Sequence, residues 1–192
     1  MNDSHNWKSL LVLAGVTCLI FCSSEAVLAQ EKKPKLILQI TVDQLRGDLP
    51  GRYLDRMGEG GFRYLLEEGI VFANAHHQHA NTETIVGHTT LATGANPAVH
   101  GMIGNVWFDR GSGEMTYNIE DERYPLLTKG ADVDKGSEID PTQKVARSEG
   151  RSPAAILTST FGDELAISTA GKAKVFGVSI KDRGAVSMAG HA

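Results

Sequence analysis

The sequence predicts an α/β fold in which helices cover both faces of a mostly parallel sheet. Three almost continuous apolar segments, residues 35–42, 70–78 and 174–180, are predicted to be strands. Apolar runs without alternation are typical of strands that are buried on both faces, as in a parallel sheet. A helical pattern separates the first two strands and is closed by Gly69, which gives the strand–helix–strand order of α/β proteins.

The N-terminal segment is predicted to be a signal peptide, residues 1–29. Lys8 supplies a positive charge, residues 10–22 are apolar, and Val27-Leu28-Ala29 forms a small-residue cleavage pattern. The apolar stretch is shorter than the roughly twenty residues that cross a bilayer. We therefore expect cleavage after Ala29, a periplasmic or secreted protein, and no stable membrane anchor.

Composition limits the classes of function for residues 30–192, which we expect to form one domain. With 41% hydrophobic and 22% charged residues, the chain has the balance of a soluble globular protein. Both cysteines lie inside the predicted signal peptide, so the mature protein has neither a disulfide nor a thiol nucleophile. A net charge of -4 gives no support for a nucleic-acid-binding surface.

The elements between the predicted strands follow from local signals. Phe62, Leu65 and Leu66 have helical spacing, residues 84–92 form a short helix ended by Gly94, and residues 106–119 form a hairpin that turns through residues 111–113. Residues 120–150 are polar and unpatterned, which predicts a surface excursion near a substrate entrance. The last parts of the chain are a predicted helix from Ser152 (N-cap) to Gly171, the third strand, and a loop without a terminal helix.

Several residues could carry chemistry, and each has an alternative structural role. Asp43 follows a buried strand, where a carboxylate can ligate a metal or cap a turn. Thr82 and Thr84 lie where a helix begins, so each is either an N-cap or a hydroxyl beside a bound anion. A threonine hydroxyl is a weak nucleophile that needs a neighbouring base or a metal. Lys181 and Arg183 suit phosphoryl oxygens, or they belong to an exposed charged loop.

The histidines give weaker evidence for a functional site than the residues above. His88 and His100 could be metal ligands or satisfied core side chains. His76, His77 and His79 suggest a metal cluster, but on a strand only the last two share a face. The sequence favours a solvated position, or one that supports other ligands, for these three side chains.

Taken together, five segments resemble the alkaline phosphatase superfamily, in the branch of type I phosphodiesterase/nucleotide pyrophosphatase-like enzymes. They are similar above all to bacterial secreted alkaline phosphatases that use threonine as nucleophile. The segments occur in family order and are VDQLRGD (42–48), GEGGFRYLLEEG (58–69), TETIVGHTTLATGANPAVHGMIGN (82–105), WFD (107–109) and SIKDRGAVSMAGH (179–191).

The resemblance implies a three-layer α/β sandwich, incomplete in this chain, with a site that holds two zinc ions. Asp43 and Thr84 would ligate one zinc, and Thr84 would be the nucleophile that forms a phosphothreonine intermediate. Asn105 would donate a hydrogen bond to a non-bridging phosphoryl oxygen. Lys181 and Arg183 would contact the remaining oxygens. This Lys-x-Arg pair favours hydrolysis of phosphate monoesters over diesters.

The expected function is therefore zinc-dependent hydrolysis of a small-molecule phosphate ester. The remaining zinc ligands of the family come from later parts of a longer chain, which predicts that residues 30–192 are an N-terminal part of the catalytic domain and are inactive alone. Two alternatives stay open. One is a phosphodiesterase or nucleotide pyrophosphatase, and the other is a non-catalytic periplasmic protein that binds an anion.

Overall fold

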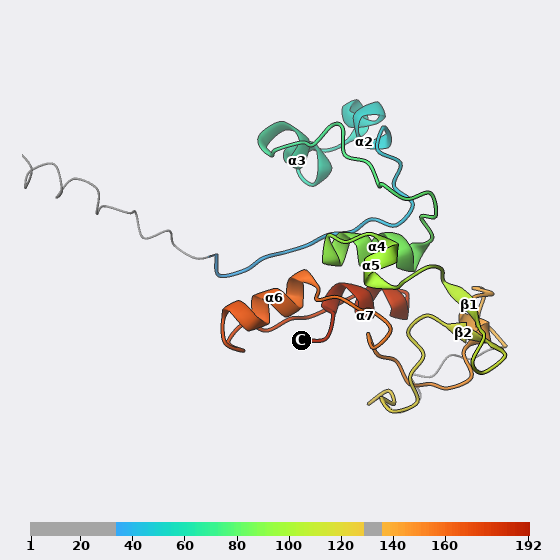
Figure 1. Cartoon of the computed structure of the whole chain (residues 1–192). Coiled ribbons are helices and arrows are strands. Elements are labelled where there is room, and N and C mark those ends of the chain that lie inside the picture. Colours follow the sequence, from blue (N-terminus) through green and yellow to red (C-terminus); the bar gives the residue numbers. More distant parts are fainter. Residues whose placement is uncertain (1–33, 129–135) are drawn as a thin grey trace, which may run out of the picture. The chain divides into compact units, whose positions relative to one another are not determined.

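The computed structural model describes residues 34–128 and 136–192 (Figure 1). The chain divides into two compact units, residues 1–40 and 41–192. The predicted signal peptide lies outside the described residues. The described part of the first unit, residues 34–40, contains no helix or strand, so every element below belongs to the second unit.

The regular structure of the second unit is mainly helical in its described residues. None of the helices described there is both long enough and apolar enough to traverse a lipid bilayer. The elements are α2 (Leu49–Arg52), the 3₁₀ turn η1 (Leu54–Arg56), α3 (Phe62–Glu68), α4 (Thr84–Thr93), α5 (Pro97–His100), β1 (Val106–Asp109), β2 (Glu114–Tyr117), the 3₁₀ turn η2 (Gln143–Val145), α6 (Phe161–Ser168) and α7 (Asp182–Ala189).

Helix α4 lies at the centre of the packed part, where it contacts α5, α6 and α7 (Figure 1). It ends at Gly94, whose φ of 67° is the left-handed conformation that glycine adopts without steric cost, as predicted. Two of its side chains, Ile85 and Val86, are fully buried. They pack in a hydrophobic core with Met102, Tyr117, Ile119, Ala146 and Ile156. The residues that immediately follow Thr84 are thus anchored in the core.

The predicted hairpin is confirmed. Strands β1 and β2 are antiparallel, and the register pairs Val106 with Tyr117 and Asp109 with Glu114. The Asp109 carboxylate accepts a hydrogen bond from the backbone N–H of Gly111 at 2.6 Å, which stabilises the turn. The hairpin places the buried Tyr117 ring in the core.

The three predicted strands do not form a sheet among the described residues, whose strand pairing is limited to β1 with β2 and one isolated bridge. Their apolar side chains are exposed: Leu36 by 79%, Ile70 by 87%, Phe176 by 85% and Ile180 by 104%. A parallel strand needs neighbouring strands for its N–H and C=O groups. Among the described residues these segments have no such neighbours, so the prediction that they are strands is wrong there.

The helix predictions in the last third of the chain also need correction. The predicted helix from Ser152 to Gly171 begins only after Thr160, whose hydroxyl and backbone N–H form a capping box with Asp163. Ser152 instead caps a local turn, since its hydroxyl accepts from the N–H of Ala154. The prediction that no terminal helix follows the last apolar segment was wrong, because α7 occupies residues 182–189.

Candidate active site

The first turn of α4 presents Thr84 beside Asp43. The Thr84 hydroxyl donates a hydrogen bond from Oγ1 to Oδ2 of Asp43 over 3.3 Å. Gln44 follows with a φ of 58°, a left-handed conformation that is strained for a side chain with a Cβ atom. This conformation turns the chain directly after Asp43. Asp43, Gln44 and Thr84 line a pocket of about 290 Å³.

Asn105 is held against the same end of α4 by two hydrogen bonds, and a further bond joins it to Asn118. Its side-chain oxygen Oδ1 accepts from the backbone N–H of Ile85 at 3.1 Å, and its own N–H donates to Oε2 of Glu83 at 2.6 Å. Its carbonyl accepts from Nδ2 of Asn118 at 2.6 Å. Because a backbone N–H can only donate, the amide orientation is fixed, and its Nδ2 group remains a donor for another partner.

Lys181 and Arg183 are brought together by the start of α7 and not by the end of a strand. Lys181 is the N-cap residue, and Arg183 lies within the first turn with its side chain only 2% exposed. The Arg183 guanidinium donates from Nη1 to the hydroxyls of Tyr117 at 3.4 Å and Thr142 at 3.3 Å. These contacts exclude, for Arg183, the exposed charged loop that was the alternative interpretation.

A second pocket, of about 490 Å³, gathers four of the five predicted site residues. Thr84 comes from α4, Asn105 from the segment before β1, and Lys181 and Arg183 from the start of α7. Thr84 lines both this pocket and the one that contains Asp43. A hydroxyl, an amide donor and two cations therefore share one open space, and this combination suits an oxyanion such as a phosphoryl group.

Asp140, which is not one of the predicted site residues, also lines this pocket. Its Oδ2 lies 2.7 Å from Nη2 of Arg183 and 3.1 Å from Nζ of Lys181. The residue belongs to the polar segment that was expected to be a surface excursion. A sequence signal was available, because Asp140 and Thr142 flank a proline just before η2, as in an Asx turn.

Burial and hydrogen bonding act in opposite directions on this ion pair. Burial alone would raise the pKa of Asp140, but hydrogen bonds from Thr142, Arg183 and Lys181 outweigh it and hold the pKa well below its ordinary value. Burial likewise favours the neutral form of Arg183, while hydrogen bonds to Tyr117 and Asp140 raise its pKa. Both groups are therefore charged at neutral pH.

The metal-binding capacity of the described residues is partial. Asp43 and Thr84 offer two oxygen donors on one side of a pocket, and zinc accepts such oxygen ligands. Within residues 34–128 and 136–192 there is no group of three or more His, Cys, Asp or Glu side chains that could hold a metal ion. The pair fits part of a zinc site, and further ligands would have to be added to it.

The histidines fall into different environments. His100 is fully buried and hydrogen-bonded to Thr90 and to the N–H of Met102, so it is a satisfied core residue. His88 donates from Nδ1 to the Thr84 carbonyl at 2.8 Å. The other three lie outside the core: His76 bonds to Asn74, the rings of His77 and His79 are 5.0 Å apart, and His79 bonds to Thr90.

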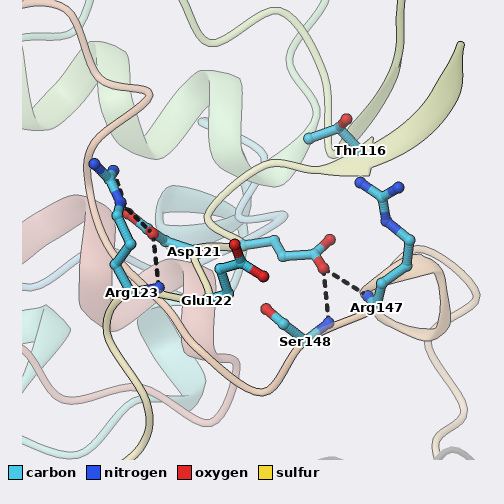
Figure 2. Close-up of a pocket in the computed structure, with 7 residues that line it drawn as sticks. Thr116, Asp121, Glu122, Arg123, Arg147 and Ser148 are labelled. Atoms are coloured by element: carbon cyan, nitrogen blue, oxygen red, sulfur yellow. Dashed lines mark hydrogen bonds and ion pairs between the residues drawn. The ribbon is translucent and has the colours of Figure 1, made fainter. Parts of the chain in front are cut away.

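A third pocket, of about 550 Å³, shares no lining residue with the two pockets described above and is formed mostly by the segment that follows the hairpin. Figure 2 shows that two of its charged residues, Arg123 and Asp121, are paired with each other. The Arg123 guanidinium bonds to Asp121, Arg147 pairs with Glu114, and the Glu120 carboxylate accepts from the N–H groups of Arg147 and Ser148, both at 2.7 Å. We interpret these contacts as interactions that hold the two ends of the polar segment, near Glu120 and near Arg147, against each other.

Comparison with known proteins supports the predicted family. The sequence profile of the type I phosphodiesterase/nucleotide pyrophosphatase family matches residues 37–178. The chain is 38% identical over 97% of its length to a protein named calcium-transporting ATPase from Myroides odoratus. It is 36% identical over 83% of its length to alkaline phosphatase PafA from Elizabethkingia meningoseptica, and 35% identical over 90% to alkaline phosphatase PhoV from Synechococcus elongatus.

Solved structures give the same result. The crystal structure of wild-type alkaline phosphatase PafA matches 78% of the chain with a TM-score of 0.65 and 35% identity. A variant of PafA with replacements at a threonine, an asparagine, a lysine and an arginine matches with a TM-score of 0.66. The chain spans 26% of each solved structure and 27–31% of the three relatives named above.

These matches confirm the predicted fold class, the alkaline phosphatase-like α/β fold, of which the chain forms a part. They also agree with the resemblance that its motifs carry from residue 42 onward. The chain belongs to the type I phosphodiesterase/nucleotide pyrophosphatase family, within the alkaline phosphatase superfamily.

Proposed function

We propose that this chain supplies the nucleophile and the phosphoryl-binding residues of a zinc-dependent phosphate monoester hydrolase. The observation that carries the proposal is the pocket that Thr84, Asn105, Lys181 and Arg183 share. The relatives named alkaline phosphatases support the same activity. We call a protein that contains this chain together with the rest of such a catalytic domain the complete protein.

The residue types of the PafA variant support this assignment. In that variant the replaced threonine and asparagine are 21 positions apart, and the replaced lysine and arginine are two positions apart. Thr84 and Asn105 have the same separation here, as do Lys181 and Arg183.

The chain's own residues would act in the following way. The Thr84 hydroxyl is oriented by its hydrogen bond to Asp43, and the dipole of α4 favours negative charge on its oxygen. Zinc held by Asp43 and Thr84 would lower the pKa of this hydroxyl and stabilise the charge on the reacting oxygens. Attack by Oγ1 on phosphorus forms a phosphothreonine and releases the alcohol. Asn105, Lys181 and Arg183 bind the non-bridging oxygens, and water then hydrolyses the phosphothreonine.

Replacement of the proposed nucleophile tests the function directly. In the complete protein, Thr84→Ala should lower kcat/KM for p-nitrophenyl phosphate by about a thousandfold or more, because removal of a nucleophile abolishes the covalent route. Thr82→Ala is the matched control, since Thr82 is the other threonine at this helix start and makes no hydrogen bond to Asp43. Equal losses in the two variants, or full activity of Thr84→Ala, would contradict the assignment.

A phosphodiesterase or nucleotide pyrophosphatase is the second candidate, and the family profile that matches residues 37–178 favours it. A diester presents one fewer charged oxygen than a monoester, so it needs Lys181 and Arg183 less. We expect the variant with Lys181→Ala and Arg183→Ala to lose about a hundredfold or more of monoester kcat/KM and much less of diester kcat/KM. Little loss of either activity, with faster turnover of the diester than of the monoester by the wild-type protein, would favour the diesterase.

Zinc content separates an enzyme from a non-catalytic anion-binding protein. About two tightly held zinc ions per complete protein, with activity lost to a chelator and restored by zinc, would support the enzyme. A protein that binds phosphate without metal would support the binding protein.

We further propose that the 192-residue chain alone does not hydrolyse phosphate esters, because its described residues contain no group of three or more His, Cys, Asp or Glu side chains that could hold a metal ion. Turnover of p-nitrophenyl phosphate by purified residues 30–192 with added zinc, lost on Thr84→Ala, would contradict this. Secretion of the protein is also part of the proposal. N-terminal sequencing of the exported form should then begin at Gln30.

A further inference from the structure

The Asp140 carboxylate contacts Lys181 and Arg183, the two cations that the proposed function assigns to substrate binding. A single oxygen, Oδ2, bridges Nζ of Lys181 at 3.1 Å and Nη2 of Arg183 at 2.7 Å. The Asp140 side chain is only 11% exposed, and it lines the same pocket as Thr84 and Asn105. A carboxylate oxygen here has the same hydrogen-bond donors that a phosphoryl oxygen would need.

The position of this carboxylate is fixed by its own segment. The other oxygen, Oδ1, accepts from the backbone N–H of Thr142 at 3.0 Å and from its hydroxyl at 2.6 Å. The Asp140 N–H donates to the Glu138 carboxylate at 2.7 Å, and its carbonyl accepts the first N–H of η2, that of Gln143, at 3.2 Å. With a further bond from the N–H of Lys144 to the same carbonyl at 3.3 Å, five hydrogen bonds hold Asp140 at the pocket without any contribution from Lys181 or Arg183.

The cation on the other side is fixed as well. Arg183 is buried and bonded to Tyr117 and Thr142, and its Nε atom is buried without a hydrogen-bond partner among the described residues. A buried guanidinium requires a negative partner, and in the described structure that partner is Asp140. An incoming phosphoryl group therefore meets a cation pair whose charge is already partly neutralised.

We propose that Asp140 sets the affinity of the site for phosphate by competing with phosphoryl oxygens for Lys181 and Arg183. This inference rests on the proposed function, because it assumes that these two cations bind the phosphoryl group. A dianionic monoester displaces or shares the carboxylate more effectively than a monoanionic diester, because it brings more charge to the two cations. The product, inorganic phosphate, is released more readily because the Asp140 carboxylate replaces it as the partner of Lys181 and Arg183.

Inorganic phosphate is the probe for this inference. Asn has nearly the shape of Asp and keeps an oxygen for Thr142, so Asp140→Asn removes the charge with little change in volume. In the zinc-loaded complete protein, we expect Asp140→Asn to bind phosphate on the order of tenfold more tightly in calorimetry, because charged hydrogen bonds of this kind no longer compete. The competitive inhibition constant of phosphate should fall by the same factor.

Asp121→Asn is the matched control, since Asp121 is also a little-exposed, ion-paired carboxylate but lines the other pocket (Figure 2). It should leave phosphate affinity unchanged. In a protein with Lys181→Ala and Arg183→Ala, Asp140→Asn should have no further effect, because the competition needs those cations.

Three results are distinguishable. Tighter binding that depends on Lys181 and Arg183 supports the inference. If the wild-type protein binds phosphate through these cations but Asp140→Asn binds it equally or less tightly, the inference fails and the proposed function stands. If the wild-type protein does not bind phosphate, both fail.

Discussion

Asn105 offers the sharpest test of the site, because the structure fixes which way its amide faces. Its Oδ1 accepts from the N–H of Ile85, so its Nδ2 is the atom available to a phosphoryl oxygen. Asn105→Asp keeps an acceptor for Ile85 but replaces the donor by a negative charge. Asn105→Ala removes both. The two variants should therefore affect stability and phosphate binding differently.

The expected magnitudes follow from these contacts. A lost hydrogen bond to a charged group corresponds to about 1.5–3 kcal/mol, and like-charge repulsion adds to that loss in Asn105→Asp. We expect its kcat/KM for a monoester to fall by at least about a hundredfold, and by more than that of Asn105→Ala. Stability should follow the reverse order. Asn105→Ala leaves the partly buried Ile85 N–H without its acceptor, at a cost of about 1–3 kcal/mol, while Asn105→Asp keeps that bond.

Both quantities are measurable on the complete protein. Steady-state kinetics with p-nitrophenyl phosphate gives kcat/KM, and urea unfolding gives the free energy of unfolding. The reasoning is refuted if Asn105→Asp keeps near wild-type kcat/KM, because the amide donor would then not face the phosphoryl group. It is also refuted if Asn105→Asp is the less stable of the two variants, since the acceptor role of Oδ1 would then be wrong.

Two further predictions concern stability. Asp163→Ala should lower the free energy of unfolding by about 2–4 kcal/mol in a urea titration, because the Asp163 carboxylate caps α6 through Thr160 and is little exposed. Ser168→Ala is the control on the exposed side of the same helix, and it should change the free energy of unfolding by less than about 0.5 kcal/mol. Burial lowers the pKa of His100 below its ordinary value of 6.5, so the folded state binds fewer protons than the unfolded state. The free energy of unfolding should therefore be highest above pH 6.5 and fall as the pH drops below it. In unfolding curves at pH 5 to 8, His100→Gln should reduce this pH dependence.

Local signals in the sequence predicted the elements that local interactions stabilise. The start of α4 at Thr84, its end at Gly94 and the hairpin turn near Gly111 depend on residues a few positions apart, and all three are confirmed. The start of α6 was mispredicted because two capping signals compete, at Ser152 and at Thr160. The capping box at Thr160 has two reciprocal bonds, and it determines where the helix begins.

Contacts between distant segments could not be predicted in this way. Asp140 lies more than forty positions before Arg183, and no periodic pattern connects them. The sequence indicated that Lys181 and Arg183 are two cations close together, but not that a carboxylate contacts both of them in the pocket. Only the packing of the polar segment against α7 and Tyr117 brings that charge to the site.

The same distinction explains why parts of the site differ in how well they are positioned. Thr84 and Asn105 depend on α4 and its core residues, and Arg183 depends on a buried hydrogen-bonded network, all formed within the described residues. Asp43 follows an apolar segment that has no strand partners within residues 34–128 and 136–192, and Asp43 is exposed. A strand with neighbours on both sides would restrict the backbone on which Asp43 lies. The phosphoryl-binding half of the proposed site can therefore form from the described residues, whereas precise placement of the proposed metal-binding carboxylate requires a completed sheet.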